Sequence, residues 1–281
     1  MLYNIRVVAN AKQNKREGSR QTDQNKPNMA AIEVTNLVKY FKNTKAIDDI
    51  SFSVGAGECF SLLGPNGAGK TTTLNILSTL LKPTAGKALV AGFDVAKQKN
   101  EVRQSIGIVF QEPALDSKLT GKENLEFHAM MYGIKPSIRD ERIKSLLQLV
   151  ELTEKAETLV QNYSGGMKRR LEIARGLIHR PKVLFLDEPT LGLDSQTRRL
   201  IWDYIKKLNK ENDVTIILTT HYMEEADFLC DRIAIIDRGK IVVNDSPANL
   251  KKLHNTNSLD DVFIKYTGNT IRNIEEREKI W

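Results

Sequence analysis

The sequence predicts an α/β fold in which a parallel β-sheet is preceded by an antiparallel β sub-domain and interrupted by a helical sub-domain. Residues 183–186 and 214–218 are apolar without a break, and a helical pattern over 195–208 separates them. Continuously apolar strands that alternate with helices are typical of a parallel sheet covered on both faces. Strand patterns before residue 64 indicate the antiparallel part, and helical spacing between residues 111 and 164 indicates the insertion.

The expected elements follow in order along the chain. Turn residues Gly55 and Gly57 separate the second and third strands, and Pro83 and Pro181 end helical patterns. The expected strands cover residues 32–38, 46–54, 58–63, 106–110, 183–186, 214–218 and 232–236, and a hairpin follows at 238–240. The expected helices cover residues 70–81, 124–132, 138–150, 154–159, 165–179 and 195–208.

Composition excludes several classes of protein. The 281 residues are 41% hydrophobic and 27% charged, an ordinary globular mixture that excludes a wholly disordered or collagenous chain. No apolar run approaches the roughly 18–20 residues that cross a bilayer, and the polar start does not resemble a signal peptide. Cys59 and Cys230 lack metal-ligand spacing and are too few for a disulfide framework, so we expect them to be buried and inert in a reducing compartment.

The net charge of +7 is unevenly distributed. Residues 1–28 hold six basic and two acidic side chains, so more than half of the net charge lies in this segment. Because the segment has hardly any aromatic residues that could stack on bases, we expect a disordered basic leader and no nucleic-acid partner. We expect one domain over residues 29–245, with the helical sub-domain at about 112–165, and a helical tail over 246–281.

A phosphate-binding motif is the strongest chemical signal. The pattern G-x-x-x-x-G-K-[ST] would occur by chance in about one sequence of this length in a hundred. A strand precedes it and a helix follows it, so glycine N–H groups and the helix N-terminus face one anion. Lys70 would then bridge the β- and γ-phosphates of a nucleotide, and the Thr71 hydroxyl would ligate Mg²⁺. The expected ATP-binding residues here are Gly64, Pro65, Asn66, Gly67, Ala68, Gly69, Lys70, Thr71 and Thr72.

Two carboxylates end the buried strand at 183–186. Nucleotides bind at the carboxyl end of parallel strands, which is where Asp187 and Glu188 lie. Successive side chains on a strand point to opposite faces, so the two acids should have different roles. We expect Asp187 to hold Mg²⁺ through water, and Glu188 to orient or deprotonate the attacking water.

A third motif, Ser164-Gly165-Gly166, begins the helix expected at 165–179. Ser164 is a natural N-cap, and the glycines leave N–H groups accessible to an anion; alone, this would be an ordinary helix cap. About twenty residues before the Asp187-Glu188 strand, however, this motif resembles the signature motif of ATP-binding-cassette (ABC) ATPases. Gln111 resembles the family's Q-loop, Asp194 its D-loop and His221 its switch histidine. The other histidines, His128, His179 and His254, have no such placement.

The resemblance covers roughly residues 31–245 and implies a P-loop NTPase core of the RecA-like type. It implies catalytic roles for Glu188, His221 and Gln111, magnesium binding by Thr71, Gln111 and Asp187, and ATP contacts from Ser164, Gly165, Gly166 and Asp194. It also implies an aromatic residue that stacks on adenine; Phe41 fits that spacing best, and Tyr40 is the alternative. The usual signature is L-S-G-G-Q, whereas this chain has Tyr163 and Met167 at its ends.

The resemblance also implies partners. In the family, the signature motif of one subunit completes the nucleotide site begun by the P-loop of another, so a second ATP-binding subunit, most simply a second copy, is expected. A separate transmembrane permease would hold the chain at the cytoplasmic side of the membrane. The segments 222–227 and 258–268 resemble those of drug- and antibiotic-resistance subunits and lipid exporters, which favours export.

Alternative classes fit less well. A soluble ABC ATPase acting on ribosomes or nucleic acid usually has two cassettes, long coiled coils or zinc modules, and this sequence shows one cassette without heptads or a cysteine cluster. A P-loop small-molecule kinase would not require Ser164 or His221. The ATPase subunit of an importer is a further alternative, and the transported molecule is not apparent from the sequence.

Overall fold

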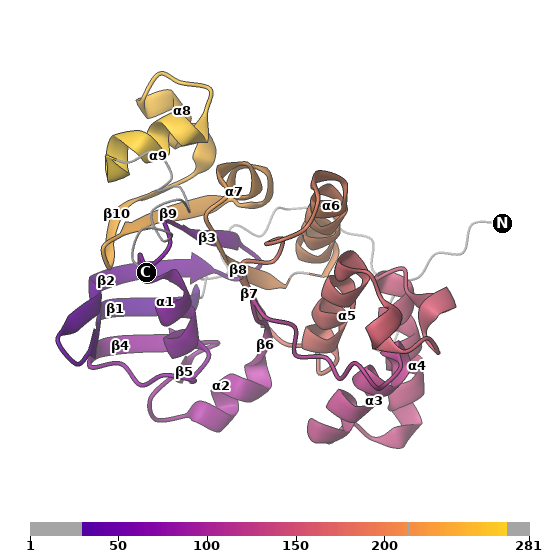
Figure 1. The fold of residues 1–281 in the computed structure, drawn as a ribbon. Helices are drawn as coiled ribbons and strands as arrows, with labels where there is room; N and C mark the ends of the chain where they lie inside the picture. The colour runs from indigo at the N-terminus through magenta and orange to yellow at the C-terminus, as the bar shows by residue number, and fades with distance from the viewer. Residues whose placement is uncertain (1–29, 213, 269–281) are drawn as a thin grey trace, which may run out of the picture.

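In the computed structural model, residues 30–268 are described, apart from residue 213. The leader expected at 1–28 and the end of the tail at 269–281 lie outside these residues. Two β-sheets and the helices around them make up the described part (Figure 1). One sheet has four strands in the order β2-β1-β4-β5, and the other has six in the order β10-β9-β3-β8-β7-β6.

The four-stranded sheet is the antiparallel part that the sequence predicts. Its strands are β1 (Ala30–Phe41), β2 (Thr44–Gly55), β4 (Ala85–Val90) and β5 (Phe93–Asp94). β1 pairs antiparallel with β2 on one side and with β4 on the other. Alternation along β1 and β2 buries Ile32, Val34 and Phe52 on one face, which is the pattern of a sheet with one solvated side.

The six-stranded sheet is parallel except at one edge, as predicted. Its strands are β3 (Cys59–Leu63), β6 (Ile106–Val109), β7 (Val183–Asp187), β8 (Thr215–Thr220), β9 (Arg232–Asp237) and β10 (Lys240–Asp245). Every residue of β3, β7 and β8 is buried, because helices or the other sheet cover both faces. Only β10 runs antiparallel, in a hairpin with β9.

Two apolar clusters lie on the two faces of this sheet. Along β7, Leu184 and Leu186 belong to one cluster, and Val183 and Phe185 belong to the other, as the alternation of a strand requires. α1 (Lys70–Leu77) lies between the two sheets and contacts β7 and β8 of one and β2 and β4 of the other. α5 (Gly165–Leu177), α6 (Ser195–Asn212) and α7 (Met223–Leu229) contribute side chains to the opposite cluster.

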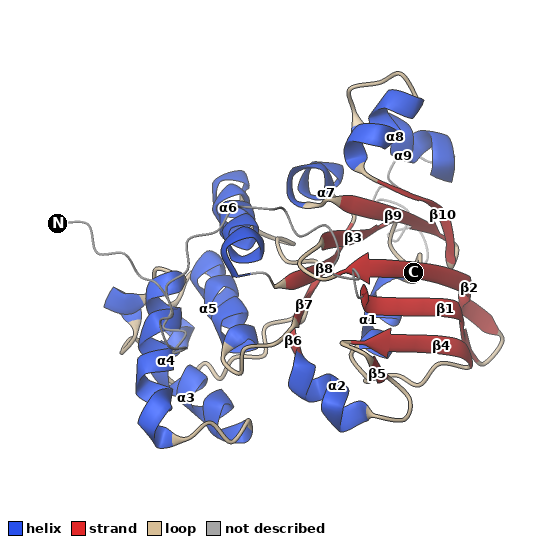
Figure 2. Ribbon diagram, turned by 180° about the vertical axis from the view of Figure 1, so that it is seen from behind, coloured by secondary structure: helices blue, strands red, loops and turns tan. Residues whose placement is uncertain are grey.

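The remaining helices lie at the ends of the molecule. α3 (Gly121–Met131) and α4 (Pro136–Leu149) pack beside α5 at the end away from the antiparallel sheet (Figures 1 and 2). α8 (Pro247–Leu253) and α9 (Leu259–Thr267) pack together next to α7 and β9, and α2 (Lys99–Ser105) leads directly into β6. A capping box between Thr120 and Glu123 starts α3, and Pro136 starts α4.

Some expected elements are wrong or incomplete. The helix expected at 154–159 is absent: this stretch has a short 3₁₀ turn, Thr153–Lys155, followed by a bridge from Leu159 to Thr120 and a second 3₁₀ turn at Val160–Asn162. The Val160 N–H bonds to the Leu119 carbonyl, 2.9 Å away, so this backbone pairs with the loop before α3 instead of with itself. The helix expected at 70–81 ends at Leu77, because Thr79 adopts a left-handed φ of 67°.

Candidate active site

The phosphate-binding motif, residues 64–71, forms the loop between β3 and the start of α1, and this segment is called the P-loop. The chain packs so closely at Gly64 that a Cβ atom there would lie 2.3 Å from the Ile236 carbonyl oxygen. Gly69 has a left-handed φ of 109°, and a Cβ atom there would lie 2.6 Å from the Ala46 carbonyl oxygen. Both positions therefore need glycine for the packing of the loop against β9 and β2, in addition to any close approach of a ligand.

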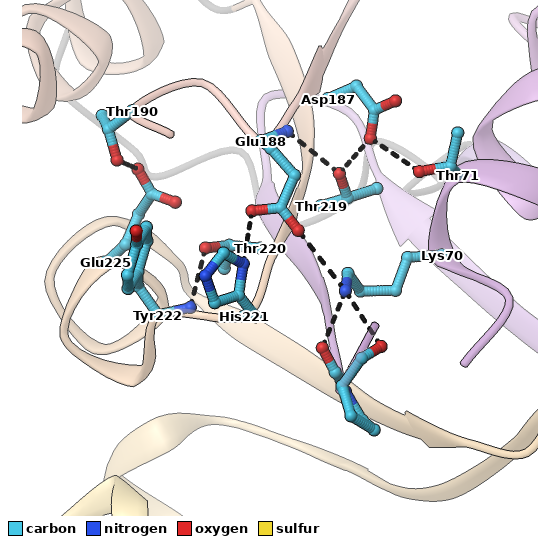
Figure 3. A network of polar contacts seen from close by, with 12 residues as sticks. Lys70, Thr71, Asp187, Glu188, Thr190, Thr219, Thr220, His221, Tyr222 and Glu225 are labelled. Atoms are coloured by element: carbon cyan, nitrogen blue, oxygen red, sulfur yellow. Dashed lines mark hydrogen bonds and ion pairs between the residues drawn. The ribbon is translucent and has the colours of Figure 1, made fainter. Parts of the chain in front are cut away.

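Lys70, the first residue of α1, points back into this loop (Figure 3). Its Nζ donates to the carbonyl oxygens of Gly64, at 2.7 Å, and Pro65, at 3.2 Å, and lies 3.4 Å from Oε1 of Glu188. The side chain is buried, and this burial lowers the pKa of Lys70, while the carboxylate of Glu188 opposes that effect. The ammonium group is thus held where the P-loop and the end of β7 meet.

Thr71, the second residue of α1, contacts Asp187 at the carboxyl end of β7. The Thr71 hydroxyl donates to Oδ1 of Asp187 over 3.1 Å, and the Thr219 hydroxyl of β8 donates to the same oxygen over 2.5 Å (Figure 3). A hydroxyl and a carboxylate side by side are hard oxygen ligands, and Mg²⁺ is commonly held by one or two carboxylates together with substrate phosphates. Among the described residues no group of three or more His, Cys, Asp or Glu could hold a metal.

Glu188 lies between Lys70 and His221. Its Oε2 is 2.8 Å from Nδ1 of His221, and its Oε1 faces Lys70. The backbone of Glu188 is left-handed, with φ of 48°, and its N–H is 3.1 Å from both the carbonyl oxygen and the hydroxyl of Thr219. A non-glycine residue in this region is strained, and such strain persists only where surrounding bonds hold it. The carboxylate therefore has a position fixed by several separate elements.

The serine-glycine motif caps α5, as the sequence predicts. The Ser164 hydroxyl accepts from the Met167 N–H over 3.2 Å, and Gly165 is exposed with only Leu193 near its Cβ position. Gly166, in contrast, packs against α6, since a Cβ atom there would lie 2.5 Å from Cγ2 of Thr197. α5 and α1 lie on opposite faces of the six-stranded sheet, so the chain separates this motif from its own P-loop (Figure 1).

The unusual Tyr163 before this motif has a packing role. It is buried, and its hydroxyl donates to the Lys155 carbonyl oxygen over 2.6 Å. The same hydroxyl would lie 2.2 Å from a Cβ atom at Gly121. Tyrosine at this position therefore connects the start of α5 to the first residue of α3 by packing and to the 3₁₀ turn after α4 by a hydrogen bond, which an aliphatic residue could not donate.

Three further expected residues have different surroundings. Gln111 is exposed just after β6, and His221 is partly exposed beyond β8. The Asp194 carboxylate accepts from the N–H and the hydroxyl of Thr197, over 2.9 and 2.6 Å, at the start of α6. These bonds lower the pKa of Asp194, the hydroxyl bond most. In this structure Asp194 caps a helix, a role that the sequence analysis did not assign to it.

The two aromatic candidates lie together at the end of β1. Tyr40 and Phe41 are 43% and 44% exposed, which leaves both rings available for stacking. Lys45 lies over the Tyr40 ring, 5.6 Å from its centroid, and Lys39 lies over the Phe41 ring at 5.0 Å. The β1–β2 turn is close to the P-loop because the Ala46 carbonyl packs against Gly69. Both residues thus lie near the P-loop, and both rings are candidates for stacking on adenine.

Sequence reasoning missed three buried charged residues around this site. Arg169 and Glu172 lie on α5, and Glu225 lies on α7. Glu225 accepts from the Thr190 hydroxyl at 2.7 Å (Figure 3) and from Nε1 of Trp202 at 2.8 Å, and burial raises the pKa of Glu225. A signal existed in the helical spacing, because Glu225 lies four residues before the buried Leu229 and thus on the apolar face of its helix.

These features define a class of protein. A strand, a glycine loop and a helix hold a buried lysine and a threonine against two acids at the end of a neighbouring parallel strand, and a histidine follows the next strand. This arrangement is that of a P-loop nucleoside triphosphatase.

The comparisons with known proteins identify the family within this class. The family model described as ABC transporter matches residues 47–191. The linearmycin resistance ATP-binding protein LnrL of Bacillus subtilis is 44% identical over 211 residues, which cover 75% of this chain and 68% of LnrL. The Nod factor export ATP-binding protein I of Burkholderia lata is 43% identical over 219 residues, covering 78% and 72%.

A solved structure agrees with these relatives. The dimeric, post-hydrolysis ATP-binding cassette MJ0796 bound to ADP and Pi has a TM-score of 0.69 and 31% identity, covering 76% of this chain and 98% of that one. The chain belongs to the ABC transporter family and is an ATP-binding, ATP-hydrolysing subunit. The predicted family and fold class are thereby confirmed. Between residues 30 and 268, none of the described helices has the length and hydropathy of a membrane span.

Proposed function

We propose that this chain is the ATPase subunit of a membrane exporter and that two copies close on ATP to drive a separate permease. The observation that carries the proposal is the arrangement of Lys70, Asp187 and Glu188, with Glu188 in contact with His221. The relatives support the direction of transport, because their names refer to linearmycin resistance and to Nod factor export. The transported molecule would be a drug, an antibiotic or a lipid.

The phosphates of ATP would bind in the P-loop. The N–H groups of Asn66 and Gly67 and those at the N-terminus of α1 offer donors to the anion, and the buried Lys70 supplies the positive charge. Thr71 and Asp187, with Gln111 from the end of β6, would hold Mg²⁺, which offsets the negative charge of the phosphate groups when bound. Phe41, or Tyr40 beside it, would stack on the adenine ring.

Glu188 would act on the attacking water. Its carboxylate is buried and already oriented by His221 over 2.8 Å, so little reorganisation would be needed to accept a hydrogen bond from water. Asp187 is fixed separately by Thr71 and Thr219, which keeps the two acids in different roles. His221 would hold Glu188 in place and sense the terminal phosphate.

The second half of the site would come from a partner. Because α5 and α1 lie on opposite faces of the sheet, Ser164, Gly165 and Gly166 would contact the nucleotide of a facing copy, together with Asp194. The dimeric state of MJ0796 supports this pairing. The helical sub-domain beyond Gln111 would dock on the permease at the cytoplasmic side of the membrane, a reducing compartment that suits two free cysteines.

A Glu188→Gln variant tests the proposal. The amide keeps the shape of the side chain but accepts protons poorly, so the variant should bind Mg-ATP, lose at least about 100-fold in turnover and accumulate a dimer. Size-exclusion chromatography with light scattering would detect the dimer, and phosphate release would measure turnover. Glu224→Gln, an exposed change on α7, is the matched control. A Glu188→Gln protein that stays monomeric with ATP and hydrolyses it normally would contradict the proposal.

A further inference from the structure

Arg169 lies on α5, the helix that begins at the Ser164-Gly165-Gly166 motif, and its side chain makes an unusual set of contacts. Arg169 lies in the first turns of α5, is 7% exposed, and each of its guanidinium nitrogens donates to a protein oxygen. Nε donates to the Pro189 carbonyl at 2.6 Å, Nη1 to the Phe110 carbonyl at 2.6 Å and to Glu172 at 3.1 Å, and Nη2 to the carbonyls of Asp187 and Glu188 at 3.0 Å each. A guanidinium has five N–H donors, so its full capacity is used.

The acceptors share one property: they are the backbone of the site. Asp187, Glu188 and Pro189 follow one another at the end of β7, and Phe110 immediately precedes Gln111. Since Arg169 binds carbonyl oxygens, the carboxylates of Asp187 and Glu188 stay available for Thr71, Lys70 and His221. The bond to the Glu188 carbonyl also helps to hold the strained φ of 48° at that residue.

Glu172 extends this connection to the far side of the loop that contains Gln111. It is 1% exposed, its Oε2 accepts from Arg169, and its Oε1 accepts from the Ala114 N–H over 2.8 Å. The segment from Phe110 to Ala114 is therefore hydrogen-bonded to α5 at both ends. A buried ion pair is costly unless its remaining donors and acceptors are satisfied, and here they are satisfied by the backbone around the site.

We propose that Arg169 and Glu172 are positioning residues that couple the signature end of α5 to the catalytic residues of the same chain. The proposal rests on the head-to-tail pairing proposed above, in which Ser164 contacts the nucleotide of the other copy. In that pairing, one helix has its cap at one nucleotide and its Arg169 at the residues that act on the other. A displacement of α5 then moves Gln111 and Glu188 with it, so that ATP binding at one site prepares hydrolysis at the other.

Arg169→Lys and Glu172→Gln test this coupling. Lysine keeps the charge but has one nitrogen in place of the planar guanidinium, so it cannot bind all four carbonyl oxygens in the two segments. Both variants leave the P-loop unchanged, so nucleotide affinity should stay within about twofold, whereas kcat should fall about 10- to 100-fold and the Hill coefficient for ATP should fall to one. Lys168→Arg, on the partly exposed adjacent position, is the control and should resemble the wild type.

The readouts separate positioning from folding. Affinity is measured with a fluorescent, non-hydrolysable ATP analogue, and the folded fraction by thermal unfolding of the full chain. If either variant folds and retains the wild-type kcat and Hill coefficient, or if kcat falls only in proportion to the folded fraction, the coupling is wrong. If Glu188→Gln fails to dimerise with ATP and the wild type shows a Hill coefficient of one, the proposed function fails first and the coupling fails with it.

Discussion

Buried titratable side chains at single positions explain both the chemistry and part of the stability of this protein. Glu188 has its place because a lysine from the P-loop and a histidine after β8 contact its two oxygens. His128 is a contrasting case at a distance from the site. It lies beside Tyr132, whose ring stacks on His179 at 3.8 Å, and Nε2 of His179 bonds to the Ile106 carbonyl. No catalytic role follows from this stack, but it has consequences for stability.

The pH dependence of stability should show the effect of His128. Burial, together with the positive charge of Arg175 and the neighbouring His179, lowers the pKa of His128 from 6.5 to about 4. The unfolded chain therefore binds a proton between these values that the folded chain does not, and the free energy of unfolding should decrease as pH falls from 6.5 toward 4. Burial lowers the pKa of His179 as well, so both contribute in the same direction.

A His128→Gln variant removes one of these contributions. Its urea unfolding, measured between pH 7 and pH 4.5, should depend on pH less steeply than that of the wild type, with the difference appearing below pH 6.5. Equal slopes for the two proteins over this range would show that His128 is not held neutral by its surroundings.

Among the elements, α5 combines the most roles. Its cap is Ser164, its face toward α6 contains Gly166, and Arg169 and Glu172 join it to β7 and to the loop after β6. Gly165 and Gly166 are adjacent in the motif but differ in surroundings: the first is open, and the second is packed against Thr197. Two adjacent glycines of one motif therefore have different surroundings: Gly166 is needed for helix packing, and only Gly165 leaves room for the proposed nucleotide contact.

Alanine substitutions should separate these two glycines. In Gly166→Ala, the new Cβ would lie 2.5 Å from Cγ2 of Thr197, and Thr197 cannot rotate away without breaking its hydroxyl bond to Asp194. We expect a loss of about 1–3 kcal/mol in the free energy of unfolding. Gly165→Ala meets Leu193 at an ordinary 3.4 Å and should be near neutral.

A compensating change gives a sharper test of this steric argument. Serine at position 197 keeps the hydroxyl for Asp194 and removes the methyl group that clashes. The double variant Gly166→Ala, Thr197→Ser should therefore recover most of the stability lost in Gly166→Ala, as measured by urea unfolding. Without recovery, the cost at position 166 would have another origin.

For the whole molecule, the proposed nucleotide site lies where two sheets and two apolar clusters adjoin. The P-loop packs against β2 of one sheet through Ala46 and against β9 of the other through Ile236, and α1 fills the space between the sheets. A ligand bound there would contact residues from several elements at once. Binding should therefore stabilise the entire described fold and not only the loop.

Thermal unfolding with nucleotide measures this effect. A non-hydrolysable ATP analogue with Mg²⁺, at about 100 times its Kd, should add about 2.7 kcal/mol to the free energy of unfolding and raise Tm by several degrees. Lys70→Ala should lose most of this shift, because it removes the buried charge that faces the phosphates. An exposed lysine on α4, changed in Lys144→Ala, is the control. An equal Tm shift in Lys70→Ala would contradict the role of Lys70 in phosphate binding.

The failed sequence predictions have physical reasons, which lie in contacts between segments that are separate along the chain. Residues 154–159 contain good helix formers, yet the N–H of Val160 pairs with Leu119, a partner that only the folded chain provides. The sequence did not predict β4, because its first three residues are exposed and show no alternation of buried and exposed positions. It forms a strand through its antiparallel pairing with β1. The two cysteines also show that the sequence does not predict contacts between distant residues. Both are buried as expected, but their sulfur atoms lie 3.8 Å apart although 171 positions separate them.

The sequence by itself determined the class of site, because glycines, a lysine, a threonine and strand-ending acids at fixed spacing are dictated by short-range geometry. It also determined the parallel sheet, since continuously apolar strands must be covered on both faces. Only the tertiary structure decided which groups meet: His221 with Glu188, Thr219 with Asp187, and Arg169 with two separate segments, the end of β6 and the end of β7. These contacts join residues that are remote along the chain, and no local periodicity encodes the distance between them.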